Sequence, residues 1–285
     1  MNIKIYQINY ERDKNHVKFL NYDHLDSFQK TKGINSSIYD EVFCGNVDCM
    51  DLEDVFRKFN TEGHPLHRGH SLSVSDIVIV DGDVPNLVGR LRFFNSSSAF
   101  EECNYTDEER FHRDIHEAYE VGRTIEVEEL SDQNIPTIEC GAYYCDSVGF
   151  QKVDFDESQT LKPDNLMQIV YVEPHKAPYI SKIEHSLEAE QKAVGGLIEP
   201  IYNDDGTCLV GNEEAKLIGM DGNRYLDDGN SIIAGPFFVC GLTEDSFRGL
   251  TDEEVVKYMD KFAEPQDISS EEVEADTGFI FYMGM

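Results

Sequence analysis

The chain has 285 residues, and 24 lysines and arginines against 56 aspartates and glutamates give it a formal net charge of −32. Hydrophobic residues make up 40% of the chain, with 17 phenylalanines and 14 tyrosines, which supplies enough apolar side chains for folded cores and excludes a wholly disordered chain. The charge disfavours binding to nucleic acid or to anionic membranes, and no apolar stretch approaches the roughly 20 residues of a membrane span.

The first part of the chain predicts strands around one helix. Residues 2–8 alternate and are rich in β-branched side chains, which predicts an opening strand. Residues 51–59 place apolar side chains on one helical face and acids in the first turn, which predicts a helix. After a polar loop, the apolar residues 77–80 predict a strand that ends at an Asp-Gly turn. Residues 141–145 and 150–155 predict two further strands.

An acidic segment separates these strands. Residues 95–98 (NSSS) are typical of a linker, and residues 101–132 hold 12 acids and 3 bases, a net charge of −9. Part of it, residues 107–119, has a helical pattern. We predict an acidic insertion at about 95–135. The acidity is not confined to it, because residues 1–158 and 159–285 each carry a net charge of −16.

The polar, proline-containing residues 156–165 predict a domain boundary. The elements predicted beyond it are a strand at 167–172, a short helix from 186 that Gly195-Gly196 ends, a hairpin around Asp205-Gly206, a buried strand pair or bulged strand at 232–240, and a helix capped by Thr251 that runs to Phe262. Residues 264–276 are predicted to be a solvated acidic linker before an apolar end, 279–285.

Strands and helices do not alternate along this chain as they do in a parallel sheet. The predicted fold class is therefore α+β, with two small mixed domains that contain antiparallel sheets. We place the first domain at 1–157, with the acidic insertion inside it, and the second at 166–263. Residues 264–285 form the linker and the apolar end.

Two sets of sequence strings resemble known families. GHSLSVSDIVIV (69–80) and GAYYCDSVGF (141–150) resemble the YodL-like domain, in which the two strings are expected to form a strand and its partner. The second resemblance, to domain-of-unknown-function family 3846, rests on VEPHKAPYISKIE (172–184), VGGLIEPIY (194–202), NEEAKLIGMDGNR (212–224) and IIAGPFFVCGL (232–242). Neither family implies an activity. Both imply a setting in phages and conjugative elements of Gram-positive bacteria, often beside anti-restriction proteins.

Histidines and carboxylates offer no complete catalytic motif. His64, His67 and His70 share one loop, but their spacing fits no usual zinc signature, so we expect them to be structural or surface histidines. Carboxylate pairs occur throughout the chain and cannot be singled out as acid–base groups. Phosphate-binding glycine loops and nucleophile motifs are absent from the sequence. We therefore predict a protein that is not an enzyme and has no cofactor.

The cysteines allow one candidate metal site. His112 and His116 stand one helical turn apart, and Cys140 and Cys145 could complete a zinc set, but the cysteines lie on a predicted strand where both thiols need not converge. We predict no bound metal. Seven cysteines at irregular spacings predict free thiols in a reducing cytosol. With no signal-peptide pattern in the first residues, we expect the cytoplasm of a bacterial host.

The leading functional hypothesis is an acidic counter-defence protein. It would inhibit a host defence protein that targets nucleic acid, of the anti-CRISPR or anti-restriction type, by imitating the charge of DNA or RNA with carboxylates. Its partner is a basic nucleic-acid-binding surface, and we expect no direct binding to nucleic acid or membrane. The candidate binding residues lie outside the strings quoted above, and they are Glu101, Glu102, Asp107, Glu108, Glu109, Glu126, Glu128, Glu129, Asp132, Glu271, Glu272, Glu274 and Asp276.

Two other functions stay open from the sequence. A module that binds or sequesters a small molecule such as a nucleotide signal would need a local basic site, with Arg90, Arg92, Arg224 or Arg248 overriding the acidic field. A protein-interaction adaptor could instead dock through the apolar end at 279–285.

Overall fold

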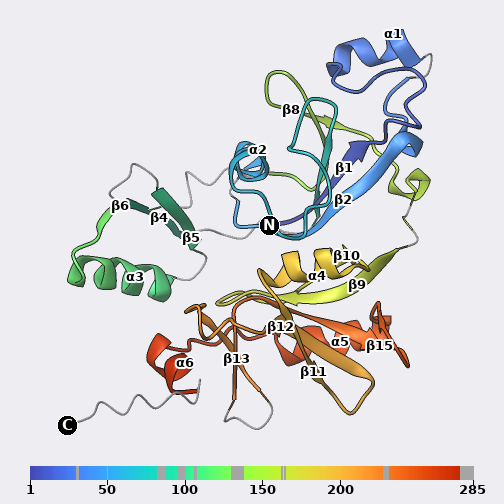
Figure 1. Ribbon diagram of the computed structural model, residues 1–285. Coiled ribbons are helices and arrows are strands. Elements are labelled where there is room, and N and C mark those ends of the chain that lie inside the picture. Colours follow the sequence, from blue (N-terminus) through green and yellow to red (C-terminus); the bar gives the residue numbers. More distant parts are fainter. Residues whose placement is uncertain are drawn as a thin grey trace, which may run out of the picture. The chain divides into compact units, whose positions relative to one another are not determined.

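The computed structural model describes residues 1–29, 32–49, 51–81, 88–94, 100–105, 108–129, 138–161, 163, 165–226 and 231–276. These residues form helices and antiparallel sheets, which confirms the predicted α+β class (Figure 1). The chain divides into two compact units. The first consists of Met1–Glu41, Asn46–Gly63 and His70–Thr160, and the second of Val42–Gly45, His64–Gly69 and Leu161–Met285.

The first unit contains a five-stranded sheet of order β2-β1-β3-β7-β8. Its elements are β1 (Asn2–Ile8), η1 (Tyr22–His24), α1 (Leu25–Gln29), η2 (Ser36–Ile38), β2 (Tyr39–Asn46), α2 (Leu52–Thr61), β3 (Ile77–Asp81), β7 (Gly141–Cys145), β8 (Phe150–Val153) and η3 (Glu157–Gln159). Apolar residues 77–80 are buried because β3 is the central strand. It pairs antiparallel with β7, Ile79 opposite Ala142, as expected for the two YodL-like strings.

Between β3 and β7 the chain forms a small folded element with its own core. A three-stranded antiparallel sheet of order β5-β4-β6 packs against one helix, and Figure 1 shows this arrangement in green. The bounds are β4 (Gly89–Phe94), β5 (Phe100–Tyr105), α3 (Glu108–Glu120) and β6 (Thr124–Glu129). Leu91, Tyr105 and Phe111 form its buried centre. We call residues 89–129 the insertion element. It starts upstream of residue 95.

The second unit contains a sheet of order β10-β9-β15-β12-β11, with β16 beside β15, and a separate strand pair, β13-β14. Its elements are β9 (Leu166–Val172), β10 (Tyr179–Glu184), α4 (Leu187–Val194), β11 (Ile198–Tyr202), β12 (Thr207–Asn212), β13 (Gly222–Tyr225), β14 (Ile232–Ala234), β15 (Phe237–Leu242), β16 (Phe247–Arg248), α5 (Asp252–Lys261) and α6 (Ser270–Asp276). The predicted hairpin is β11-β12. The segment at 232–240 is two strands that belong to different sheets.

Helices α4 and α5 cover opposite faces of this sheet. Val239 of β15 packs in one buried cluster with Val255 and Tyr258 of α5. Side chains alternate along a strand, so Cys240 projects to the other face, where the hydroxyl of Tyr171 in β9 donates to a backbone carbonyl of α4 at 2.6 Å. None of the described helices is long and apolar enough to cross a membrane.

The prediction that residues 264–276 form a solvated linker is wrong. Ser270–Asp276 form helix α6, and its Val273 is buried in one cluster with Ile268, Ala215 and Ile232. Close packing is also seen at Gly222, where an added Cβ atom would lie 2.6 Å from a methyl carbon of Ile268. Two apolar side chains among many acids are enough to fold this segment against β14.

Candidate functional site

For some of the predicted acidic residues the structure describes the side chain, for others only the backbone, and for others neither. Asp107 and Asp132 lie outside the described residues, as does the apolar end at 279–285. For Glu101, Glu102 and Glu109 the backbone is placed in β5 or α3, and their side chains lie outside the description. For the remaining predicted acids, the structure also places the side chains.

Glu126 and Glu128 pair with arginines of the neighbouring strand. The apolar residues of β6 face α3, so these two glutamates project from the opposite face, where β4 places Arg90 and Arg92. Arg92 Nη1 lies 3.3 Å from Glu126 Oε2, and Arg90 Nη1 lies 3.9 Å from Glu128 Oε2. The fold therefore neutralises part of this acidic strand.

Arg90 also connects the insertion element to helix α2. Its side chain is only 6% exposed, and its Nη2 atom lies 3.1 Å from Oδ2 of Asp54. Asp54 Oδ1 accepts in turn from Arg57 at 2.6 Å. A buried charge that loses its partner is strongly destabilising, so the role of Arg90 in this structure is to hold two elements together.

Four predicted or neighbouring acids stay exposed on the insertion element. Glu108 and Glu120 each lie near a histidine one turn away on α3, at 3.8 and 3.7 Å, and such exposed pairs are weak. Glu117 and Glu129 are exposed and form no ion pair with another described residue. We call these four residues the insertion acids. Their exposed carboxylates can be reached by a partner.

At the C-terminal end, the fold uses Glu272 and Asp276. Asp276 Oδ2 accepts from the Lys216 ammonium at 2.7 Å. Glu272 accepts hydrogen bonds from the hydroxyls of Ser269 and Tyr225, each at 2.7 Å. These hydrogen bonds lower the pKa of Glu272 to about 2. These two predicted binding residues therefore help to hold α6 in place.

Glu271 and Glu274 of α6 remain exposed, and they are not the only acids near this helix. Glu213 and Glu214 directly precede Ala215, which packs into the same buried cluster as α6. These two glutamates are also exposed. We call these four the α6 acidic cluster. This grouping could not be predicted from the sequence, because it depends on contacts between side chains far apart along the chain.

The candidate zinc ligands do not form a metal site among the described residues. The described residues contain no group of three or more histidines, cysteines, aspartates or glutamates that could hold a metal ion. Of the loop histidines, His64 is buried, packs edge-on against Phe43 at a centroid distance of 4.7 Å, and accepts from the Leu66 amide at 3.1 Å. This environment agrees with a structural role for His64.

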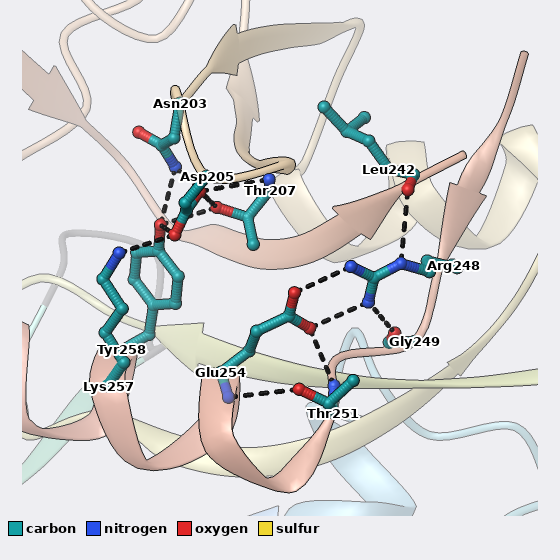
Figure 2. A network of polar contacts seen from close by, with 10 residues as sticks. All are labelled: Asn203, Asp205, Thr207, Leu242, Arg248, Gly249, Thr251, Glu254, Lys257 and Tyr258. Atoms are coloured by element: carbon teal, nitrogen blue, oxygen red, sulfur yellow. Dashed lines mark hydrogen bonds and ion pairs between the residues drawn. The ribbon is translucent and has the colours of Figure 1, made fainter. Parts of the chain in front are cut away.

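A polar network joins the β11-β12 turn to α5 (Figure 2). Asp205 accepts from Lys257 and Thr207, each at 2.6 Å, and from the Tyr258 hydroxyl at 3.0 Å. Burial raises the pKa of Asp205, but these hydrogen bonds outweigh burial and leave the pKa well below its usual range. Each of these side chains forms a hydrogen bond with another of them, so the network holds the β11-β12 turn against α5.

The arginines considered for an anionic ligand are all engaged by the fold. Arg248 forms a two-pronged pair with Glu254, with N–O distances of 2.7 and 2.8 Å, and its hydrogen bonds lower the pKa of Glu254 to about 2 (Figure 2). Arg90 and Arg92 form the pairs described above. Arg224 is buried and donates to backbone and side-chain carbonyl oxygens.

The sequence does not reveal one unusual carboxyl group, that of Asp76. It is fully buried beside β3, and its Oδ2 atom accepts from Gln7 Nε2 at 2.9 Å and from the Ser73 amide at 2.8 Å. Its Oδ1 atom has no hydrogen-bond partner among the described residues. The preceding residue, Ser75, has a φ of 79°, a strained conformation for a non-glycine residue. Burial raises the pKa of Asp76 to about 7.

We expect Asp76 to make folding stability depend on pH. Its folded pKa is raised above the usual 3.8, so the native state binds the proton more tightly. The protonated state then stabilises the fold below about pH 4, and this contribution, about 2–4 kcal/mol, is lost as the pH rises to about 7. Asp76→Asn should remove that slope. Urea unfolding at pH 5 and pH 8 measures it, with the exposed Asp204→Asn as control. An equal difference between wild type and Asp76→Asn at both pH values would contradict this.

Comparison with known families covers most of both units. Residues 2–105 match the YodL-like domain, and residues 167–263 match the domain of unknown function DUF3846. The string at 141–150 lies beyond the first match, although its strand β7 pairs with β3. Neither a curated protein nor a solved structure matches the chain. The chain thus carries a YodL-like domain followed by a DUF3846 domain.

Proposed function

We propose that this protein inhibits a nucleic-acid-targeting defence protein of a bacterial host, of the anti-CRISPR or anti-restriction type, by occupying its basic groove. The supporting observation is the exposure of the insertion acids Glu108, Glu117, Glu120 and Glu129 on a folded element. Carboxylates accept charge-assisted hydrogen bonds from arginine and lysine as phosphates do. The resemblance to domains of mobile elements favours a target in host defence.

The packing of the insertion element supports a binding role for these acids. Its core around Leu91 and Phe111 holds α3 against the sheet, and Arg90 attaches the sheet to α2. The exposed carboxylates therefore project from regular secondary structure, so the backbone that carries them is already ordered before binding. The α6 acidic cluster is a second candidate surface on the other unit.

The engagement of the four arginines disfavours the small-molecule alternative. An anionic ligand such as a nucleotide needs cationic side chains that are free to bind it. The net charge of −32 on the protein also repels such a ligand. Arg224 and Arg248 donate to oxygens of the fold, and Arg90 and Arg92 pair with glutamates and Asp54. The same negative charge attracts a basic protein surface and speeds its association.

Capture from lysates tests the proposal. Immobilised protein is exposed to lysates of bacteria that carry restriction or CRISPR systems, at low ionic strength. We expect a retained nucleic-acid-binding protein that duplex DNA displaces and that elutes as salt is raised, because exposed charges are screened within about 10 Å at 0.1 M salt. A retained partner that neither DNA nor salt releases would contradict the proposal. So would capture of enzymes that bind no nucleic acid.

A further inference from the structure

Two buried cysteines lie side by side in the sheet of the second unit. Cys208 of β12 and Cys240 of β15 are direct partners across an antiparallel pair of strands. Their Sγ atoms are 3.5 Å apart, and both side chains are fully buried. They share the face of the sheet that α4 covers, away from the cluster around α5. Neither thiol takes part in the acidic surfaces or in the polar network.

We propose that Cys208 and Cys240 form a reversible disulfide that crosslinks β12 to β15 under oxidising conditions. A disulfide requires Cβ atoms about 3.5–4.5 Å apart and a sulfur separation of about 2.05 Å. Directly opposed residues of antiparallel strands have Cβ atoms about 4.5–5.5 Å apart. The strands would therefore approach by about 1 Å, and the register of the sheet would be unchanged.

The two thiols influence each other's ionisation through the contact between them. The hydrogen bond with Cys240 lowers the pKa of Cys208, while the same contact and burial raise the pKa of Cys240. The charged groups that act on the pair are Glu190 of α4, which opposes a thiolate at either sulfur, and Arg248, which favours one at Cys240. Either sulfur can donate the hydrogen bond that joins them, so either thiol can supply the thiolate, which is the nucleophile.

A peroxide is the chemical class of oxidant that completes the reaction. One sulfur of the pair attacks one peroxide oxygen, so that an S–O bond forms, the O–O bond breaks and water leaves. The other sulfur then attacks the sulfur of the resulting sulfenic acid, which forms the S–S bond and releases a second water. Two thiols and one hydrogen peroxide give one disulfide and two waters. Both protons of the thiols end in water.

Burial makes this a slow reaction that requires local opening of the sheet. A small oxidant reaches the sulfurs only when β15 or α4 moves away. Once formed, the crosslink closes a loop that contains β13 and β14, and it restricts the unfolded chain. We expect the oxidised protein to unfold at a temperature about 10 °C higher than the reduced protein.

The test treats the full chain with hydrogen peroxide, blocks free thiols with iodoacetamide, and maps crosslinked peptides by mass spectrometry. We expect one dominant crosslink, Cys208 to Cys240, which dithiothreitol reverses together with the rise in unfolding temperature. Cys208→Ala should abolish both effects, and Cys140→Ala, which removes an exposed thiol, should leave them unchanged.

A second arm removes burial as an obstacle to the reaction. The protein is unfolded in urea and refolded in glutathione buffers of increasing oxidising strength, and the fraction of the Cys208–Cys240 crosslink is measured. It should become the main species in the oxidising buffers. Recovery of folded protein in which both cysteines are alkylated as free thiols in every buffer would overturn the proposal, as would a dominant crosslink to another cysteine.

Discussion

Arg224→Met is expected to lower the free energy of unfolding of the second unit by about 2–4 kcal/mol. The Arg224 side chain is 1% exposed, and burial lowers its pKa. Its Nη2 atom donates to the Lys176 carbonyl at 2.7 Å and to the Phe262 carbonyl at 3.0 Å, so it joins the β9-β10 turn to the end of α5. Methionine would leave these carbonyl oxygens buried without a donor.

Two opposing effects decide the size of this loss. Removing a buried cation relieves its desolvation, since no described acidic residue forms an ion pair with Arg224. The loss of hydrogen bonds lowers stability, because each buried acceptor left without a donor costs about 1–3 kcal/mol. We expect this loss to be larger than the gain from removing the buried charge. Arg224→Lys should be intermediate, since one ammonium cannot reach every oxygen. Arg113→Met, at an exposed site on α3, should change stability by less than about 0.5 kcal/mol. Unchanged or higher stability of Arg224→Met in urea unfolding would contradict this role.

Local signals in the sequence predicted most elements of the fold. Thr251 forms a capping box with Glu254 at the start of α5, and Gly195 adopts the left-handed conformation that ends α4. The Asp205-Gly206 turn joins β11 to β12. These features depend on neighbouring residues alone. The pairing of β3 with β7 came from the family resemblance, since the acidic segment separates the two strands.

Features that depend on distant contacts could not be predicted. Residues 264–276 have the composition of a linker, and α6 folds because Val273 meets Ala215 and Ile232. For the same reason the sequence could not show that Glu126 faces Arg92, or that Asp276 faces Lys216. Some of the predicted binding residues thus form ion pairs and hydrogen bonds within the fold. That these acids bind a partner stays a prediction.

Neutralising the insertion acids is expected to slow association with the captured partner by about tenfold or more, because exposed charges steer encounter. The variant combines Glu108→Gln, Glu117→Gln, Glu120→Gln and Glu129→Gln. It spares Glu126 and Glu128, whose removal would leave Arg90 and Arg92 without these partners. Exposed charges carry little stability, so the fold should persist, as urea unfolding would show.

A matched control removes four exposed charges from the second unit. It combines Glu199→Gln, Asp204→Asn, Glu244→Gln and Asp245→Asn, which lie outside the α6 acidic cluster. Glu213 and Glu214 are unsuitable as controls because they belong to that cluster. A third variant, Glu271→Gln with Glu274→Gln, tests the α6 acidic cluster separately.

The most direct test of the proposed function is displacement of labelled duplex DNA from the captured partner. The wild-type protein should displace DNA in a salt-sensitive manner, the insertion-acid variant should need a concentration about tenfold higher or more, and the matched control should behave like wild type. Equal losses in the variant and the control would mean that only bulk charge matters. If the wild-type protein binds the partner but does not displace DNA from it, the proposed function is contradicted.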